Sequence, residues 1–286
     1  MTEPVRPCQG LHLAEHPDDR PSTSSNSYTD SYYLTACEGY DQLDLGSDRD
    51  TTSPRLIAAL ELVKPEPGDR ILDVGCGRGE TILYCARHGA DAYGLDYSAA
   101  ALQIVQKRLS TTPHALHARI HIARGDAKRL PFKDGSFDKV LMLDLVEHLH
   151  PWELEKALAE ARRLLIAGGQ LIIHTAPNRW YYLLGYPLYR LYQWSRGRRL
   201  PPDPRSRFPF HYLHVNEQDI LGLRRSLQQA GFEATVWLEN LASPVVEEPS
   251  PVLGPLVRLL VRFLLQSYPF RWVFRNDIFG LACKRE

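Results

Sequence analysis

The hydrophobic pattern of the chain alternates between two kinds of segment. Short runs dominated by apolar residues have the length of buried strands, and longer segments with apolar residues three or four positions apart have the spacing of helices. The predicted strands lie at 70–74, 92–95, 120–123, 139–143, 170–175, 234–238 and 277–283. The predicted helices lie at 54–63, 79–88, 98–109, 151–166 and 217–230. This alternation predicts an α/β fold with a mostly parallel sheet and right-handed crossovers.

Local signals mark the ends of some of these elements. Ser53 followed by Pro54 is typical of a helix start, because the serine can cap the helix and proline suits its first position. The pair Gly168-Gly169 is expected to end the helix at 151–166.

A glycine-rich turn, Asp73-Val-Gly75-Cys-Gly77-Arg-Gly79, joins the first strand to the next helix. Glycines let the backbone approach a ligand closely, and the helix that follows offers free N–H groups. A dinucleotide site would place a third small residue where Glu80 stands, and carboxylates at 73 and 80 would repel a pyrophosphate. The turn therefore favours a nucleoside that carries positive charge and no phosphate, such as a sulfonium nucleoside.

Three further carboxylates follow the ends of later strands. Asp96 lies 21 residues beyond Gly75, Asp126 follows the strand at 120–123, and Asp144 follows the strand at 139–143. Parallel strands end at one edge of a sheet, so these side chains are expected near the glycine turn. Asp96 could accept both hydroxyls of a ribose; the alternative is that it caps the helix that begins at Ser98.

Taken as an ordered set, these motifs resemble those of class I S-adenosylmethionine-dependent methyltransferases, and the small-molecule and quinone O-methyltransferases are the nearest subgroup. The resemblance covers residues 50–240 and the last strand. It implies a Rossmann-like seven-stranded sheet of order 3-2-1-4-5-7-6, with the last strand antiparallel and helices on both faces. It also implies S-adenosylmethionine as cofactor, bound by Asp73, Gly75, Cys76, Gly77, Asp96, Tyr97, Asp126, Ala127 and Asp144.

The sequence Asp144-x-x-Glu147-His148 follows the fourth strand. In some relatives an E-x-x-E-H motif at this place binds a divalent metal, and His211 or His214 could then complete the set of ligands. In many others the pair is metal-free and supports the pocket. We predict no metal, with His148 and Asp144 as the catalytic residues, and we rank His174, His211 and His214 behind them as bases.

The domain is expected to cover residues 28–286. Residues 1–27 are rich in Pro, Ser and Asp and poor in large apolar groups, so we expect a disordered tail. The segment 28–65 carries recurring tyrosines; its helices either fold over the glycine turn as a lid or pack on the core.

Two insertions, 179–214 and 251–274, leave from strand ends and should meet on a rim above the cofactor. The first is rich in arginine and aromatic residues, and the second is apolar with Arg258 and Arg262 four positions apart. Such a rim suits a small or lipid-like acceptor, or peripheral membrane contact through 251–274. The alternatives are that the insertions pack on each other as a lid or dimer face, or that they bind single-stranded nucleic acid.

Composition narrows the remaining choices. The 34 Lys and Arg balance the 34 Asp and Glu, so a nucleic-acid partner is disfavoured. The five cysteines show no C-x-x-C spacing and predict reduced thiols. No signal peptide or spanning segment is visible, so we expect a cytoplasmic protein, with peripheral attachment to the inner face of the membrane as the variant; the oligomeric state stays open.

The predicted function is methyl transfer from S-adenosylmethionine to a small or lipid-like acceptor, by O-methylation. An RNA 2′-O-type methyltransferase is one alternative. A second is an NAD-dependent oxidoreductase on a similar fold, which Asp73 and Glu80 disfavour. A third is a regulatory protein that binds the cofactor without turnover.

Overall fold

The computed structural model describes residues 22–37, 53–195, 197–208, 210–239, 241, 267 and 270–285. Most of the predicted tail and most of the insertion at 251–274 lie outside these residues, so the predictions for them are not examined by the structure. Within the described residues, no helix is both long and apolar enough to cross a bilayer.

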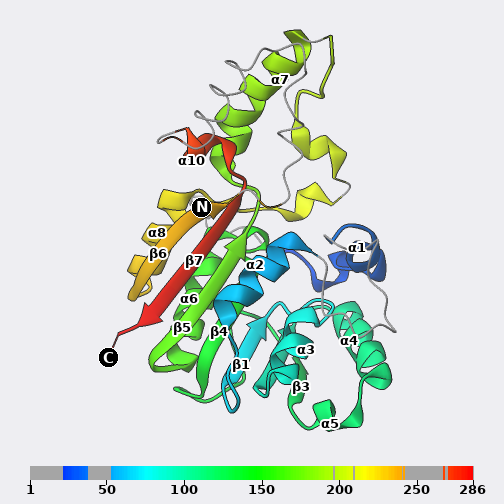
Figure 1. The fold of residues 1–286 in the computed structure, drawn as a ribbon, viewed down its shortest axis with the longest axis vertical. Helices are drawn as coiled ribbons and strands as arrows, with labels where there is room; N and C mark the ends of the chain where they lie inside the picture. The colour runs from blue at the N-terminus through cyan, green and yellow to red at the C-terminus, as the bar shows by residue number, and fades with distance from the viewer. Residues whose placement is uncertain are drawn as a thin grey trace, which may run out of the picture.

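A single seven-stranded sheet organises the fold (Figure 1). Its strand order is β3-β2-β1-β4-β5-β7-β6, as the family resemblance implies. β7 runs antiparallel to both of its neighbours, and the pairs formed by β1 to β5 are parallel. The strands are β1 (Arg70–Val74), β2 (Asp91–Asp96), β3 (Ile120–Arg124), β4 (Phe137–Leu143), β5 (Leu165–Thr175), β6 (Phe232–Glu239) and β7 (Asp277–Lys284).

Helices cover both faces of the sheet, because each parallel strand is followed by a crossover (Figure 1). The helices are α1 (Asp30–Thr35), α2 (Pro54–Val63), α3 (Glu80–Arg87), α4 (Ala99–Thr111), α5 (His114–His117), α6 (Pro151–Leu164), α7 (Tyr186–Ser195), α8 (Ile220–Gln229) and α10 (Arg271–Phe274). Successive residues of β1 serve opposite cores: Ile71 packs with Val63 of α2 and Ile82 of α3, and Leu72 belongs to the core that includes Ala161 of α6 and Leu223 of α8.

The predicted end of the helix at 151–166 is wrong. The helix ends at Leu164, and Gly168 and Gly169 lie inside β5. Leu165 is fully buried and pairs with Phe137 of β4, so burial and strand pairing outweigh the expected glycine stop.

The predicted start of the helix at 217–230 is also wrong. The helix begins at Ile220, because the Asp219 carboxylate accepts hydrogen bonds from the N–H groups of Leu221 and Gly222 and caps it there. The start at Ser53 and Pro54 is confirmed: Ser53 Oγ accepts from Leu56 N at 3.4 Å, and Pro54 opens α2.

Two segments stand apart from the layered core in Figure 1. α1 lies beside α4, where Tyr33 packs with Ala101 and Ile104. The segment η4 (Tyr181–Gly185) and α7 project beyond the sheet, and α10 contacts their base. There the Asn178 amide donates to the carbonyl of Trp272 at 2.7 Å.

Candidate active site

A cavity of about 1090 Å³ opens at the edge of the sheet where the parallel strands end. Its lining includes every residue that the sequence predicts for cofactor binding or catalysis, which are Asp73, Gly75, Cys76, Gly77, Asp96, Tyr97, Asp126, Ala127, Asp144 and His148. His211 and His214 line it as well, whereas His174 does not. Ligand pockets typically measure roughly 300–1,000 Å³, so this cavity has room for a nucleoside and a second molecule.

The glycine turn forms one end of the cavity. Gly75 and Gly77 have φ angles of 79° and 49°, which side chains rarely adopt. The N–H groups of Gly75 and Cys76 both donate to the carbonyl of Leu95, at 2.7 and 3.1 Å. A Cβ on Gly75 would lie 3.1 Å from a methyl carbon of Leu145. The turn is therefore hydrogen-bonded to the end of β2, and its glycine backbone lines the cavity without side chains.

Asp73 is a buried carboxylate that lines the cavity. Among the described residues, its Oδ1 has no hydrogen-bond partner. Burial, then the nearby Asp96 carboxylate, raise the pKa of Asp73 to about 7. A bound cation would favour the charged form of this group. The residue thus fits the ammonium group of a methionine moiety.

Asp96 is held at the end of β2 by backbone groups. Its Oδ2 accepts from Gly77 N at 2.9 Å, and its Oδ1 accepts from Ser98 N at 2.8 Å and from the Tyr33 hydroxyl at 3.4 Å. A carboxylate has about four acceptor sites, so some remain for ribose hydroxyls. Ser98 is the residue that caps the next helix, because its Oγ accepts from Ala100 N. Asp96 contacts the start of that helix through Ser98 N and can still face a ribose.

The loop after β3 supplies the third carboxylate. Asp126 forms an ion pair with Lys128 at 2.9 Å and is partly exposed to the cavity, while Ala127 beside it is buried. On the opposite loop, the Tyr97 hydroxyl donates to the carbonyl of Thr23 at 2.5 Å. The space between these residues suits a flat heterocycle with an exocyclic amine. Asp126 could accept a hydrogen bond from that amine.

The carboxylate of Asp144 lines the cavity and forms an ion pair with the buried His174. Its φ of 53° is unusual for a residue with a side chain. Two bonds to His174 hold it: Asp144 N donates to the His174 carbonyl at 3.0 Å, and His174 Nδ1 lies 2.6 Å from Asp144 Oδ1. Although burial alone would raise the pKa of Asp144, the charge of His174 lowers it. Asp144 is therefore a stable anion and a poor base.

His174 is enclosed between two carboxylates. Its Nε2 lies 3.4 Å from Asp277 Oδ1, and Arg55 pairs with that same oxygen at 2.9 Å. Burial would lower the pKa of His174, but Asp144 and Asp277 together raise it to about 9. His174 does not line the cavity, and its raised pKa favours the protonated form, so the structure does not support its ranking as a reserve base.

His148 has one ring nitrogen fixed by the backbone. Its Nδ1 lies 3.1 Å from the carbonyl of Leu213, which can only accept, so Nδ1 carries the proton. The lone pair of Nε2 then points to the Tyr32 hydroxyl at 3.3 Å. Burial, then the neighbouring His214, lower the pKa of His148 to about 3. His148 is thus a neutral imidazole whose Nε2 lone pair faces the Tyr32 hydroxyl.

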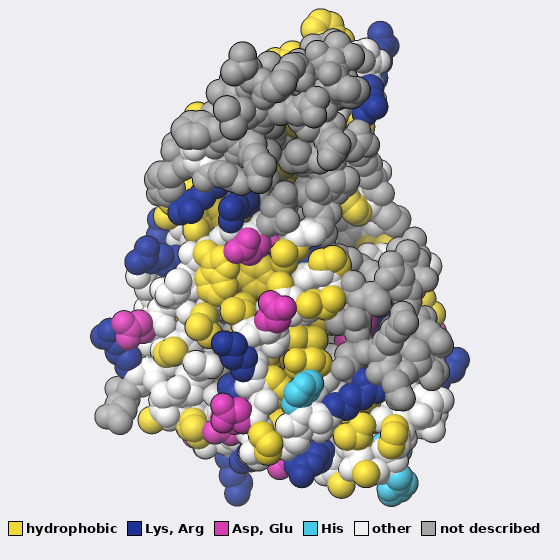
Figure 2. Space-filling model, viewed as in Figure 1, with side chains coloured by type: hydrophobic (Ala, Val, Ile, Leu, Met, Phe, Trp, Pro, Cys, Tyr) yellow, Lys and Arg dark blue, Asp and Glu magenta, His cyan; other side chains and the backbone are white. Residues whose placement is uncertain are grey.

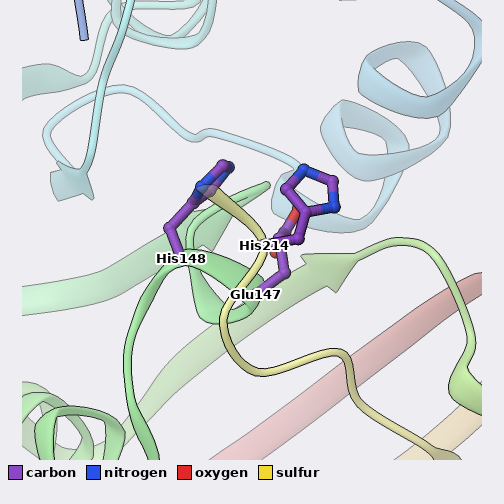
Figure 3. A group of neighbouring side chains, drawn as sticks. All are labelled: Glu147, His148 and His214. Atoms are coloured by element: carbon purple, nitrogen blue, oxygen red, sulfur yellow. The ribbon is translucent and has the colours of Figure 1, made fainter. Parts of the chain in front are cut away.

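Glu147, His148 and His214 form a cluster whose ligand-type atoms lie within 4.8 Å of one another (Figure 3). Glu147 and His148 come from the turn after β4, and His214 comes from the segment that crosses it. Glu147 is buried and accepts from the Thr175 hydroxyl at 2.7 Å. Two imidazoles and a carboxylate are donors that suit Zn²⁺ or Fe²⁺ more than Mg²⁺. Asp144, which the metal hypothesis includes, is paired with His174 instead.

Some cavity residues had no clear signal in the sequence. Arg205 binds Glu217, with Nε 2.7 Å from Oε1, and lies 4.7 Å above the ring of Tyr182; all three line the cavity. Arg55 on α2 reaches Asp277 on β7. Such contacts join segments far apart in the chain. The clustered tyrosines at 28–33 were the one usable signal, and they contact both Asp96 and His148.

Comparison with known proteins agrees with this geometry. A methyltransferase-domain family matches residues 72–173. A demethylmenaquinone methyltransferase of Tropheryma whipplei is 31% identical over 186 residues, covering 63% of this chain and 73% of that protein. A phthiotriol/phenolphthiotriol dimycocerosates methyltransferase of Mycobacterium ulcerans is 39% identical over 107 residues, 37% of this chain and 36% of that protein.

Among solved structures, phosphoethanolamine N-methyltransferase 2 of Haemonchus contortus, in complex with S-adenosyl-L-methionine, has a similar fold. The TM-score is 0.60 at 18% identity, covering 91% of this chain and 58% of that one. The strand order, the glycine turn and the relatives lead to one conclusion. The chain belongs to the class I S-adenosylmethionine-dependent methyltransferases.

Proposed function

We propose that this methyltransferase acts on a hydroxyl oxygen of a small or lipid-like acceptor, and that the hydroxyl is phenolic or enolic. The observation that carries the proposal is the part of the cavity beyond the cofactor residues. There, the lone pair of His148 Nε2 faces the Tyr32 hydroxyl, at 3.3 Å, among aromatic side chains. The relatives are named for demethylmenaquinone and phthiotriol, which supports an acceptor of lipid character.

Aromatic side chains line much of this acceptor region, together with the ion pair of Arg205 and Glu217. Tyr32 packs edge-on against Phe210, with ring centroids 5.4 Å apart, and against His148 at 6.2 Å. Phe208 and Tyr182 continue the lining toward the outside. The aromatic side chains can bind an apolar ring or chain by burial, and the polar ones can fix its orientation.

The low pKa of His148 restricts the acceptor. A neutral imidazole can take a proton, but a base with a pKa of about 3 is weak. A phenolic hydroxyl, with an ordinary pKa of about 10, loses its proton far more easily than an alkyl alcohol does. Asp144, an anion on the same cavity wall, would stabilise the imidazolium that forms. His148 and Asp144 together therefore suit the deprotonation of an acidic hydroxyl.

The chain's residues then have separate tasks. When bound, S-adenosylmethionine supplies an electrophilic methyl group on a positively charged sulfur. Asp73 and Asp96 hold the amino acid and ribose ends, and the aromatic walls exclude water and align the acceptor. The hydroxyl proton moves to His148 Nε2. Transfer of the methyl group from sulfur to the acceptor oxygen would give a methyl ether and S-adenosylhomocysteine.

The test uses the full chain, labelled S-adenosylmethionine and matched acceptors. A hydroquinone with a short isoprenoid chain is compared with its bis-ethyl ether, which has the same ring and no hydroxyl. We expect label in the hydroquinone alone, recovered as a methyl ether by mass spectrometry. Label on a ring carbon or on nitrogen would overturn the oxygen assignment. The peripheral contact predicted for 251–274 stays a prediction.

A further inference from the structure

We infer that the outward face of η4 and α7 docks on the surface of an anionic lipid bilayer, from which the acceptor enters the cavity. The inference rests on the proposed lipid-like acceptor. It concerns a surface built by residues 181–195, which the structure describes, rather than the insertion at 251–274.

The amphipathic pattern of this segment is inverted. Five large apolar side chains are more than half exposed, namely Leu183, Leu184, Leu188, Leu191 and Trp194. Leu184, Leu188, Leu191 and Trp194 follow one another at spacings of three or four residues, which places them along one side of the helical segment, and Leu183 adjoins Leu184. The buried side carries tyrosines and a glutamine instead, namely Tyr181, Tyr186 and Gln193. A helix that turns its apolar face outward needs an apolar environment on that side.

The charge around this face favours anionic lipid. Residues 180–202 contain four arginines and no Asp or Glu, although the whole chain is neutral. Arg190, Arg198 and Arg199 are exposed. In Figure 2 some apolar and some basic side chains are visible at the tip of the molecule where α7 lies. Leucine and tryptophan on one face with arginine beside them are typical of helices that lie in a membrane interface.

The face is continuous with the cavity. Tyr182 lines the cavity, and the next two residues, Leu183 and Leu184, belong to the exposed face. Phe208, which is 58% exposed, also lines the cavity and extends the apolar path from its mouth. A molecule with a long apolar chain could therefore have its ring at His148 while its chain remains in the bilayer.

The experiment measures sedimentation of the full chain with phosphatidylcholine vesicles, with and without phosphatidylglycerol. We expect binding that needs phosphatidylglycerol and weakens with salt. The double variant L188E/L191E should lower the partition coefficient by roughly tenfold or more, because two leucines no longer enter the apolar layer. The control is Leu221→Glu on α8, a leucine that is 42% exposed and lies away from this face, which should bind like the unmodified protein.

Two further readouts separate the possible outcomes. Turnover of a water-soluble short-chain hydroquinone should be the same in L188E/L191E, so loss of vesicle binding with intact turnover supports the docking face. Absence of turnover in every form would contradict the proposed function instead. Unchanged vesicle binding in L188E/L191E overturns the inference. So does a mass change on gel filtration without vesicle binding, since a second copy would then cover the face.

Discussion

The two walls of the cavity are built in different ways. The cofactor wall comes from a continuous stretch of strand ends, where backbone N–H groups fix Asp96 and the glycine turn. The acceptor wall is assembled from α1, the turn after β4 and the segment 205–217, and side chains hold it together. Backbone geometry therefore determines the cofactor wall, whereas side-chain packing determines the acceptor wall.

The strongest test of the cofactor wall is Asp96→Ala. The substitution removes the acceptor for Gly77 N and Ser98 N together with the expected ribose contact. Hydrogen bonds to a charged group contribute about 1.5–3 kcal/mol each, so S-adenosylhomocysteine affinity should fall by roughly a hundredfold or more. Calorimetric titration measures it. Asp91→Ala, at the other end of β2, should bind normally; equal affinity in both variants would refute the assignment.

The matching test of the acceptor wall is His148→Gln. Loss of the Nε2 base should reduce the turnover number by about a hundredfold, the lower range for general base catalysis. S-adenosylhomocysteine affinity should stay within about twofold, since His148 belongs to the other wall. The control is His121→Gln on β3, which stacks on Tyr93 away from the cavity. A variant that loses cofactor affinity and keeps turnover would show that the two walls are not separate.

A smaller effect concerns pH. In the ligand-free protein the pKa of Asp73 is raised from 3.8 to about 7, so between these values the folded state binds the extra proton. The stability this contributes is present at low pH and is lost as the pH rises through about 7. The free energy of unfolding should therefore decrease between about pH 5 and pH 8 in the unmodified protein. The decrease should exceed that of the Asp73→Asn variant by more than about 1 kcal/mol. Denaturant titrations at several pH values measure the free energy of unfolding of both proteins. An identical pH dependence in the two would mean that the pKa of Asp73 is not raised in the folded state.

The smallest expected effect is that of metal removal. We expect that a chelator changes turnover by less than about twofold, because the predicted chemistry needs only the neutral lone pair of His148. Turnover is measured before and after dialysis against a chelator, then with Zn²⁺, Fe²⁺ or Mg²⁺ restored. Activity that disappears and returns with one ion would instead make Glu147, His148 and His214 its ligands, and would remove His148 from the role of base.

The contrast between the walls also explains what the sequence could reveal. The strand order is what the family resemblance implies, and the carboxylates at strand ends follow from local periodicity and from short motifs. Their positions were predictable because a parallel sheet brings successive strand ends together. The helix end at Leu164 was missed because pairing of Leu165 with Phe137 overrode the glycines. The positions of Tyr32 and Arg205 depend on contacts between distant segments, which no local pattern encodes.

The alternating row Asp144, His174, Asp277 and Arg55 has a consequence for engineering. It joins β4, β5, β7 and α2 beneath the cavity, and β7 starts at the third member of the row. Asp277 is thereby fixed at the sheet edge regardless of the chain that leads to it. The insertion before β7 could therefore be exchanged for one of another length while the charge row keeps the cofactor edge in register.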